Sequence, residues 1–204
     1  METKEFNPRV ILLVGYARAG KDTVADNIVQ LHADKGMLSL TQKFAEPLYQ
    51  MMYSMFIETG ELDDGEIDKD AIVPFAPNQI TFRKALQTLG TEWGRDVLGG
   101  NIWANLLCAR ISFLPKLFPV LTTIPDCTIV VSDCRFVNEA TTVREAFSNV
   151  EIWSVVRNES DPQTHHRSEQ EIETLFAMSD VVIDNNGSFA DLETRVQNAL
   201  GIDK

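Results

Sequence analysis

The residues from Gly15 to Thr23 combine two glycines, a lysine and polar side chains at the spacing of a phosphate-binding loop. Glycines allow the backbone to curl so that successive N–H groups point toward phosphate oxygens. The following helix adds the positive end of its dipole, and Lys21 adds a point charge for the β- and γ-phosphates. The pattern predicts a nucleoside triphosphate site. The residues expected to bind the nucleotide are Gly15, Ala17, Arg18, Ala19, Gly20, Lys21, Asp22 and Thr23.

The loop departs from the usual pattern at the residue after Lys21. A serine or threonine normally stands there and binds Mg²⁺, whereas this sequence has Asp22 followed by Thr23. We expect Asp22 to hold Mg²⁺ through water and Thr23 to contact the α-phosphate. A chance match on a surface turn is the alternative. It is disfavoured because a buried strand precedes the loop and a helix follows it.

Alternating strands and helices surround this loop. The continuous apolar run Val10–Val14 is typical of a strand buried on both faces of a parallel sheet. The other expected strands are Met37–Thr41, Thr128–Val131, Ile152–Val156 and Val181–Ile183. Expected helices are Lys21 to about Asp34, one beginning near Pro47, Gln79–Leu89 ended by Gly90, Ile102 to about Phe113, Phe136–Phe147, about Gln170–Met178, and one capped by Ser188. Pro115 to Pro125 is expected to be a loop. The pattern predicts a three-layer α/β/α fold with a parallel five-stranded sheet.

Composition excludes several classes of protein. The 204 residues carry a formal net charge of −12, which argues against a non-specific nucleic-acid binder. No apolar run approaches the ~20 residues of a membrane helix, and the polar start does not resemble a signal peptide. The three cysteines, Cys108, Cys127 and Cys134, are expected to be buried, reduced thiols, with a metal or catalytic thiol as the alternative. We therefore expect a cytoplasmic protein. The acidic stretch Glu58 to Asp70 is interpreted as a surface loop rather than a metal site.

Further segments, taken together with Gly20–Thr23, resemble a known family. They are Thr81–Arg95 with Asn101–Trp103, Val130–Glu139, Thr164–His165, Ser168–Glu169 and Ile183–Ser188. The chain resembles the deoxynucleoside monophosphate kinases of tailed phages, which are adenylate-kinase-like P-loop kinases. The resemblance covers most of the chain and weakens between Glu58 and Asn78.

This resemblance implies transfer of the γ-phosphoryl group of ATP to a deoxynucleoside monophosphate, with Mg²⁺, to give the diphosphate. It implies a single domain, residues 1–204, with an acceptor-binding helical region at about 45–113 and a small lid at about 157–178. It is compatible with a homodimer, and with the host cytoplasm if a phage encodes the protein. ATP and the deoxynucleotide would be the partners, without nucleic acid or membrane.

The acceptor is expected to bind near one helix. Arg83 and Gln87 are four residues apart and share a helical face. A guanidinium there can grip a phosphate with two hydrogen bonds, and Arg95 is a second candidate past the helix end. A solvated surface charge is the alternative for Arg83 and Arg95. Trp103 either stacks on the acceptor base or packs in the core.

A second group of candidates follows a strand. Asp133 lies at the carboxyl end of a buried strand, where open α/β sheets bind ligands. It could orient Mg²⁺ through water, or hold the acceptor sugar or an arginine, while Arg135 could contact a phosphate. A strand-end salt bridge is the alternative for this pair. The resemblance suggests that Glu139 faces the acceptor, although a carboxylate in the first turn of a helix needs no function.

The expected lid would bring arginines to the transferred group. In adenylate-kinase-like enzymes a lid closes over the phosphates, and Arg157 and Arg167 are the candidates here. The predicted catalytic residues are Lys21, Arg83, Asp133, Arg135, Arg157 and Arg167. The alternatives are a P-loop kinase for another small acceptor, such as dephospho-coenzyme A, and a non-catalytic nucleotide-binding regulator. The sequence does not indicate which base is preferred.

Overall fold

A computed structural model describes residues 6–56, 67–123, 127–158 and 171–202. It contains a five-stranded parallel sheet in the order β2-β3-β1-β4-β5. The strands are β1 (Arg9–Val14), β2 (Leu38–Gln42), β3 (Cys127–Val131), β4 (Val150–Val156) and β5 (Val181–Asp184). All five expected strands are confirmed. The central strand β1 is buried from its second residue onward, as its continuous apolar run predicts.

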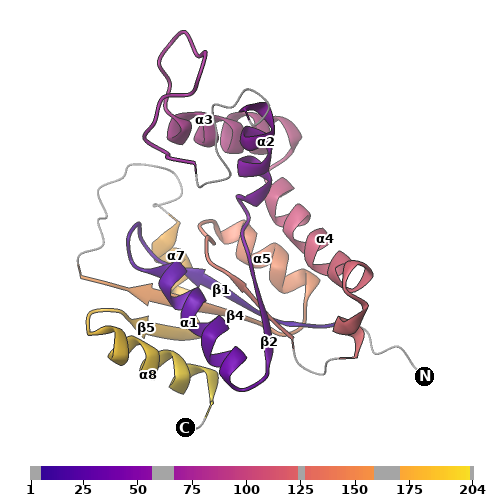
Figure 1. Ribbon diagram of the computed structural model, residues 1–204, viewed down its shortest axis with the longest axis vertical. Coiled ribbons are helices and arrows are strands. Elements are labelled where there is room, and N and C mark those ends of the chain that lie inside the picture. The colour runs from indigo at the N-terminus through magenta and orange to yellow at the C-terminus, as the bar shows by residue number, and fades with distance from the viewer. Residues whose placement is uncertain (1–5, 57–66, 124–126, 159–170, 203–204) are drawn as a thin grey trace. The chain divides into compact units, whose positions relative to one another are not determined.

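Helices cover both faces of this sheet (Figure 1). Helices α1 (Lys21–Asp34) and α8 (Phe189–Leu200) lie side by side on one face. Helices α5 (Val137–Ala146) and α7 (Ile172–Ala177) pack against the sheet from the other side. Ser188 begins α8 as predicted, because its hydroxyl accepts a hydrogen bond from the N–H of Asp191. The predicted α/β/α fold with a parallel five-stranded sheet is therefore confirmed.

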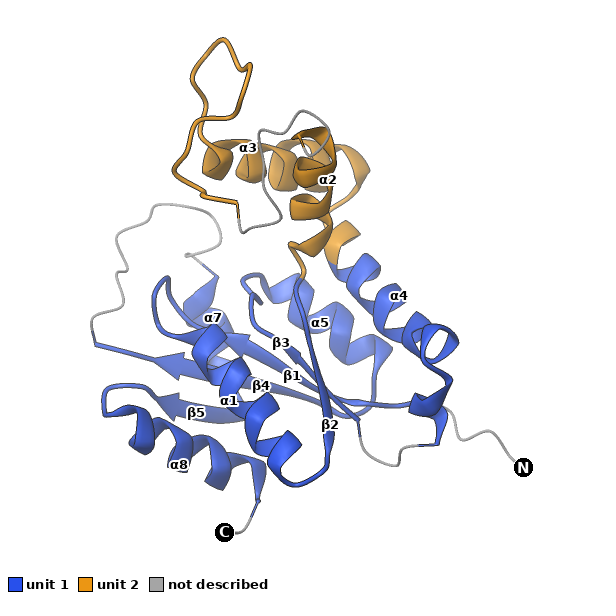
Figure 2. Cartoon of the chain, in the orientation of Figure 1, with its two compact units in different colours: residues 1–43, 104–204 blue, residues 44–103 orange. Residues whose placement is uncertain are grey.

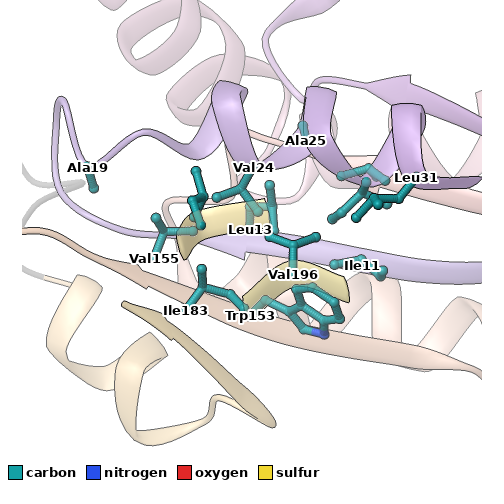
Figure 3. Packing of buried hydrophobic residues seen from close by; sticks show 13 residues of the cluster. Ile11, Leu13, Ala19, Val24, Ala25, Leu31, Trp153, Val155, Ile183 and Val196 are labelled. Carbon is teal, nitrogen blue, oxygen red and sulfur yellow. The ribbon is translucent and has the colours of Figure 1, made fainter. Parts of the chain in front are cut away.

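One hydrophobic core cluster lies between the sheet and helices α1 and α8 (Figure 3). Ile11 and Leu13 of β1 point to this side, where they meet Val24 of α1 and Val196 of α8. Trp153 of β4 belongs to the same cluster and is fully buried. Each such side chain stabilises the fold by roughly 1.5–3 kcal/mol. This packing fixes β1 and α1, and with them the two ends of the phosphate-binding loop.

The chain divides into two compact units (Figure 2). Unit 1 contains residues 1–43 and 104–204 and holds the sheet. Unit 2 contains residues 44–103, with α2 (Glu46–Phe56), α3 (Phe82–Thr88) and the π-helix η2 (Leu89–Leu98). Within unit 2, Phe56 and Phe82 pack edge to face with ring centroids 5.8 Å apart. Helix α4 (Ile102–Leu117) begins in unit 2 and continues into unit 1.

Two predictions about helix boundaries were wrong. Thr81 caps α3, which therefore begins at Phe82 rather than Gln79, and Gly90 does not end the helix, because η2 continues to Leu98. Gly90 is buried there against Leu48, so packing within unit 2 overrides the tendency of glycine to end a helix.

The expected loop from Pro115 to Pro125 was also wrong at its start. Helix α4 includes Pro115 and ends at Leu117, and Pro119–Thr122 forms a short 3₁₀ helix, η3. A proline removes one backbone N–H. The last turn still closes, because the Phe118 N–H donates to the carbonyl of Leu114 at 2.8 Å.

The cysteines are free thiols, as expected. Cys127 and Cys134 are buried, whereas Cys108 is only partly buried. Burial raises the pKa of Cys127 to about 11 and also raises the pKa of Cys134 and of Cys108 above the ordinary value. Thiols of this kind are poor nucleophiles at neutral pH.

The described parts of the chain contain no group of three or more histidine, cysteine or acidic residues placed to hold a metal ion. No single helix is long and apolar enough to cross a membrane, and only the bent pair Phe82–Leu98 and Ile102–Leu117 has the length and composition jointly. Most of the acidic stretch 58–70 lies outside the described residues.

Candidate active site

The predicted phosphate-binding loop connects β1 to α1 in unit 1. Gly20 precedes the first helical residue with φ +92° and ψ 27°, a left-handed conformation that side chains rarely adopt. The ammonium of Lys21 donates to two carbonyls of the loop itself, 2.7 Å from Gly15 O and 2.9 Å from Tyr16 O. The ammonium of Lys21 therefore lies next to the loop backbone. The sequence predicts that this charge contacts the phosphates of the nucleotide.

Asn185, which follows β5, supports this loop from a distant part of the chain. Its side-chain Nδ2 donates to the carbonyl of Ala19 at 2.9 Å, and its backbone N–H bonds to Val156 at 2.8 Å. A Cβ on Gly20 would lie 2.3 Å from the same Nδ2 atom. Gly20 is thus needed both for its backbone conformation and for the close approach of Asn185. The sequence did not identify this support, although Asn185 lies within the Ile183–Ser188 resemblance.

Asp22 is the second residue of α1 and directly follows Lys21. Its Oδ1 accepts a hydrogen bond from Ser132 Oγ at 2.8 Å and lies 3.1 Å from the ammonium of Lys43. Burial by itself raises the pKa of Asp22. The hydrogen bonds from Ser132 and Lys43, with the charges of Lys43 and Lys21, outweigh it and hold the pKa below its ordinary value. Asp22 is therefore ionised at neutral pH and has the oxygen chemistry that Mg²⁺ prefers.

The residues after β3 divide into exposed and structural ones. Asp133 directly follows Ser132 and is partly buried, whereas Arg135, two residues further along, is exposed. Glu139 is only 3% exposed, and its Oε2 accepts from the N–H groups of Arg135 at 2.9 Å and Phe136 at 3.1 Å. These contacts are those of a carboxylate that caps the start of α5.

The region of the expected lid is described only at its two ends. Arg157 follows β4 and is exposed, whereas Arg167 lies outside the described residues. At the other end, α7 contacts the phosphate loop. The Tyr16 hydroxyl bonds to Glu173, and the Tyr16 ring packs edge to face on Phe176 at 5.6 Å.

Unit 2 carries four of the six predicted acceptor-binding residues, because Asp133 and Glu139 lie in unit 1. Arg83 is exposed and forms a two-point ion pair with Asp70, with N–O distances of 3.0 and 3.1 Å. The hydrogen bonds that Arg83 donates to Asp70 raise the pKa of Arg83 above its ordinary value. Gln87 is exposed one turn further along α3, as the four-residue spacing predicts. Asp70 therefore orients the guanidinium of Arg83 while leaving it accessible to solvent.

The other two predicted acceptor residues of unit 2 make contacts inside that unit. Arg95 lies within η2, not past the helix end as predicted, and its Nη1 donates to Gly100 O at 3.0 Å. Trp103 is 3% exposed, and its indole N–H donates to Gly90 O at 2.8 Å. The ring of Trp103 lies so close to Gly94 that a Cβ there would be 2.1 Å from Cζ2. These are the contacts of a packing residue.

Comparison with solved structures gives similarities of low sequence identity. An APS kinase from Mycobacterium tuberculosis is 8% identical, with 96% of this chain and 99% of that chain covered and a TM-score of 0.48. A dephospho-CoA kinase from Campylobacter jejuni is 11% identical (95% and 96% covered, TM-score 0.42). A shikimate kinase from Acinetobacter baumannii is 13% identical (98% of each covered, TM-score 0.41).

Comparison with curated protein sequences finds no match. A family model does match the chain. The model described as deoxynucleotide monophosphate kinase covers residues 64–196, a range that includes the predicted acceptor residues of unit 2 and the segment after β3. This range is well over half of the 204 residues. The chain therefore belongs to the deoxynucleotide monophosphate kinase family.

Proposed function

We propose that this protein transfers the γ-phosphoryl group of ATP to a deoxynucleoside monophosphate, giving the diphosphate and ADP. The observation that carries the proposal is the family match over residues 64–196. The loop between β1 and α1 supports it independently, because the match begins after that loop. The left-handed Gly20 and the inward Lys21 are features that phosphate binding requires.

The nucleotide would bind on unit 1. Backbone N–H groups of residues 15–20 and the ammonium of Lys21 contact the β- and γ-phosphates, and Thr23 contacts the α-phosphate. Asp22 and Asp133 are the carboxylates that would hold Mg²⁺, through water. When bound, Mg²⁺ neutralises part of the phosphate charge. On this assignment the Lys21 ammonium, which lies next to the carbonyls of Gly15 and Tyr16, exchanges these contacts for phosphate oxygens.

The acceptor would bind through unit 2. Arg83, oriented by Asp70, grips its phosphate, and Gln87 and Arg95 add polar contacts. Arg135, Arg157 and Arg167 stabilise the charge that spreads over the transferred group. No general base is needed, because the attacking oxygen belongs to a phosphate that is already anionic. Catalysis then consists of positioning and charge neutralisation.

The test is a set of turnover assays with ATP, Mg²⁺ and each nucleoside monophosphate in its deoxy and ribo forms, followed by ADP release. We expect turnover with one or more deoxynucleotides. Lys21→Ala should abolish it, whereas Lys35→Ala, at the opposite end of α1, should not. ATP binding without turnover of any nucleotide would refute the proposal. Dephospho-coenzyme A is then the next acceptor to test, and inactivity with it would leave a regulatory nucleotide-binding role.

The acceptor side has its own matched pair of variants. Arg83→Gln should raise the KM for the deoxynucleotide and leave the affinity for ATP unchanged. Lys84→Gln, the adjacent exposed cation, should change neither. An equal effect of both variants would contradict the assignment of Arg83 to the acceptor.

A further inference from the structure

Asp22 creates an electrostatic problem at the nucleotide site. It stands where the usual loop carries a neutral serine or threonine, whereas an aspartate carboxylate is negatively charged at neutral pH. An ionised carboxylate in the first turn of α1 adds a negative charge beside the polyphosphate. Like charges a few ångströms apart repel by kilocalories even in a partly solvated site. A site with Asp22 needs a compensating cation that the usual site does not.

Lys43 is placed to be that cation. It directly follows β2, at the carboxyl end of the sheet, and its Nζ lies 3.1 Å from Asp22 Oδ1. The same oxygen accepts from Ser132 Oγ at 2.8 Å, which fixes the orientation of the carboxylate. Ser132 and Lys43 therefore both contact the same oxygen atom of Asp22, Oδ1.

The backbone of Lys43 is itself held. Arg110 of α4, in the part of α4 that belongs to unit 1, donates from Nη1 to the carbonyl of Lys43 at 3.2 Å, and its Nη2 bonds to the side chain of Gln42. This anchor fixes the starting point of the lysine side chain without involving its ammonium. The Lys43 side chain is 44% exposed and that of Asp22 is 72% exposed. An ion pair this exposed adds little to folding stability, so stability does not account for it.

We propose that Lys43 is a positioning residue of the nucleotide site that neutralises Asp22. Like the neutral serine of the usual loop, the Asp22–Lys43 pair carries no net charge beside the phosphates. Unlike a serine, it keeps a carboxylate available for Mg²⁺. This inference depends on one part of the proposed function, namely that the loop between β1 and α1 binds ATP. The identity of the acceptor does not enter it.

The test is calorimetric binding of ATP in the absence of Mg²⁺ at low ionic strength. Lys43→Met leaves Asp22 uncompensated and should weaken ATP binding about tenfold or more. Asp22→Ser should bind at least as tightly as the wild type. The double variant Asp22→Ser/Lys43→Met restores neutrality and should return to within about threefold of the wild type. The difference between Lys43→Met and the wild type should shrink as salt is added.

Lys35→Met is the matched control, since it removes the same charge at the far end of α1 and should leave ATP binding unchanged. Rescue by the double variant separates charge compensation from a folding defect. The proposal is overturned if Lys43→Met binds ATP as the wild type does, or if the double variant is as weak as Lys43→Met. Absence of ATP binding by the wild type would overturn the proposed function as well. ATP binding without deoxynucleotide turnover would overturn the proposed function alone.

Discussion

Replacing Gly20 by alanine tests the geometry of the phosphate-binding loop most directly. The backbone cost of placing an alanine in the left-handed region is roughly 1–2 kcal/mol. The added Cβ would lie 2.3 Å from Asn185 Nδ2, far inside van der Waals contact. Asn185 must then move and lose its hydrogen bond to Ala19, which is worth about 1 kcal/mol. The total is about 2–3 kcal/mol.

This cost should be measured as a loss of ATP affinity, because the loop can relax when empty but must curl to bind phosphates. About 2–3 kcal/mol corresponds to roughly 30- to 150-fold weaker binding. The assay is calorimetric titration with ATP for Gly20→Ala, Asn185→Ala and the double variant. The double variant should lose less affinity than the sum of the single losses, since the clash cannot form without the Asn185 side chain.

Gly36→Ala is the control for backbone strain alone. Gly36 also has a positive φ, +68°, but a Cβ there would meet nothing within 4 Å. This variant should lower the free energy of unfolding by about 1 kcal/mol and leave ATP binding unchanged. Binding of ATP by Gly20→Ala within threefold of the wild type would refute the reasoning, as would simple additivity with Asn185→Ala.

Three further outcomes follow from contacts described above. Arg83→Lys keeps the charge but loses the two-point geometry, so the KM for the deoxynucleotide should rise about tenfold or more while the Kd for ATP stays constant in a binding titration. Gly94→Ala forces a Cβ to 2.1 Å from the Trp103 ring and should lower the free energy of unfolding in urea by roughly 1–3 kcal/mol. Gly90→Ala, whose Cβ would meet its nearest atom at 3.1 Å, should cost less, and the reverse order would contradict the packing. His32 is buried without a partner for either ring nitrogen among the described residues, and burial lowers its pKa below 6.5. The unfolded chain therefore binds a proton that the folded protein does not, and stability should fall as the pH drops below about 6.5. His32→Gln should remove that part of the pH dependence, and an unchanged profile would count against it.

The elements that carry local signals could be predicted from the sequence. A continuous apolar run such as Val10–Val14 has one interpretation in an α/β chain, and a glycine-rich segment between it and a helix is a phosphate loop by local geometry alone. The role of the loop glycines and Lys21 could therefore be predicted without any tertiary information.

Residues that act through distant contacts could not be predicted. Ser132 meets Asp22 across 110 positions and Asn185 meets Ala19 across 166, and no local pattern pairs them. Lys43 has no motif of its own, because its relevance depends on its contact with Asp22, which lies on α1 in a separate part of the sequence.

The wrong helix boundary at Gly90 has a related cause. Glycine ends helices by propensity, but here it lets Leu48 and the indole of Trp103 come close, and packing decides. The boundary at Pro115 has a different cause. Pro115 removes one backbone N–H, but the Phe118 N–H still donates to the carbonyl of Leu114, so the last turn of α4 forms despite the proline.

The strand order has a consequence for synthesis of the chain. The first strand made, β1, is central, yet its two neighbours, β3 and β4, begin only at Cys127 and Val150. At translation rates of 5–20 residues per second, the nascent chain carries this unpaired apolar strand for roughly seven to thirty seconds before its second neighbour is made. During that interval unit 2, whose residues are contiguous, has all of its sequence available to fold. This strand order therefore leaves β1 open to association between nascent chains until β4 has been made, and slower translation prolongs that interval.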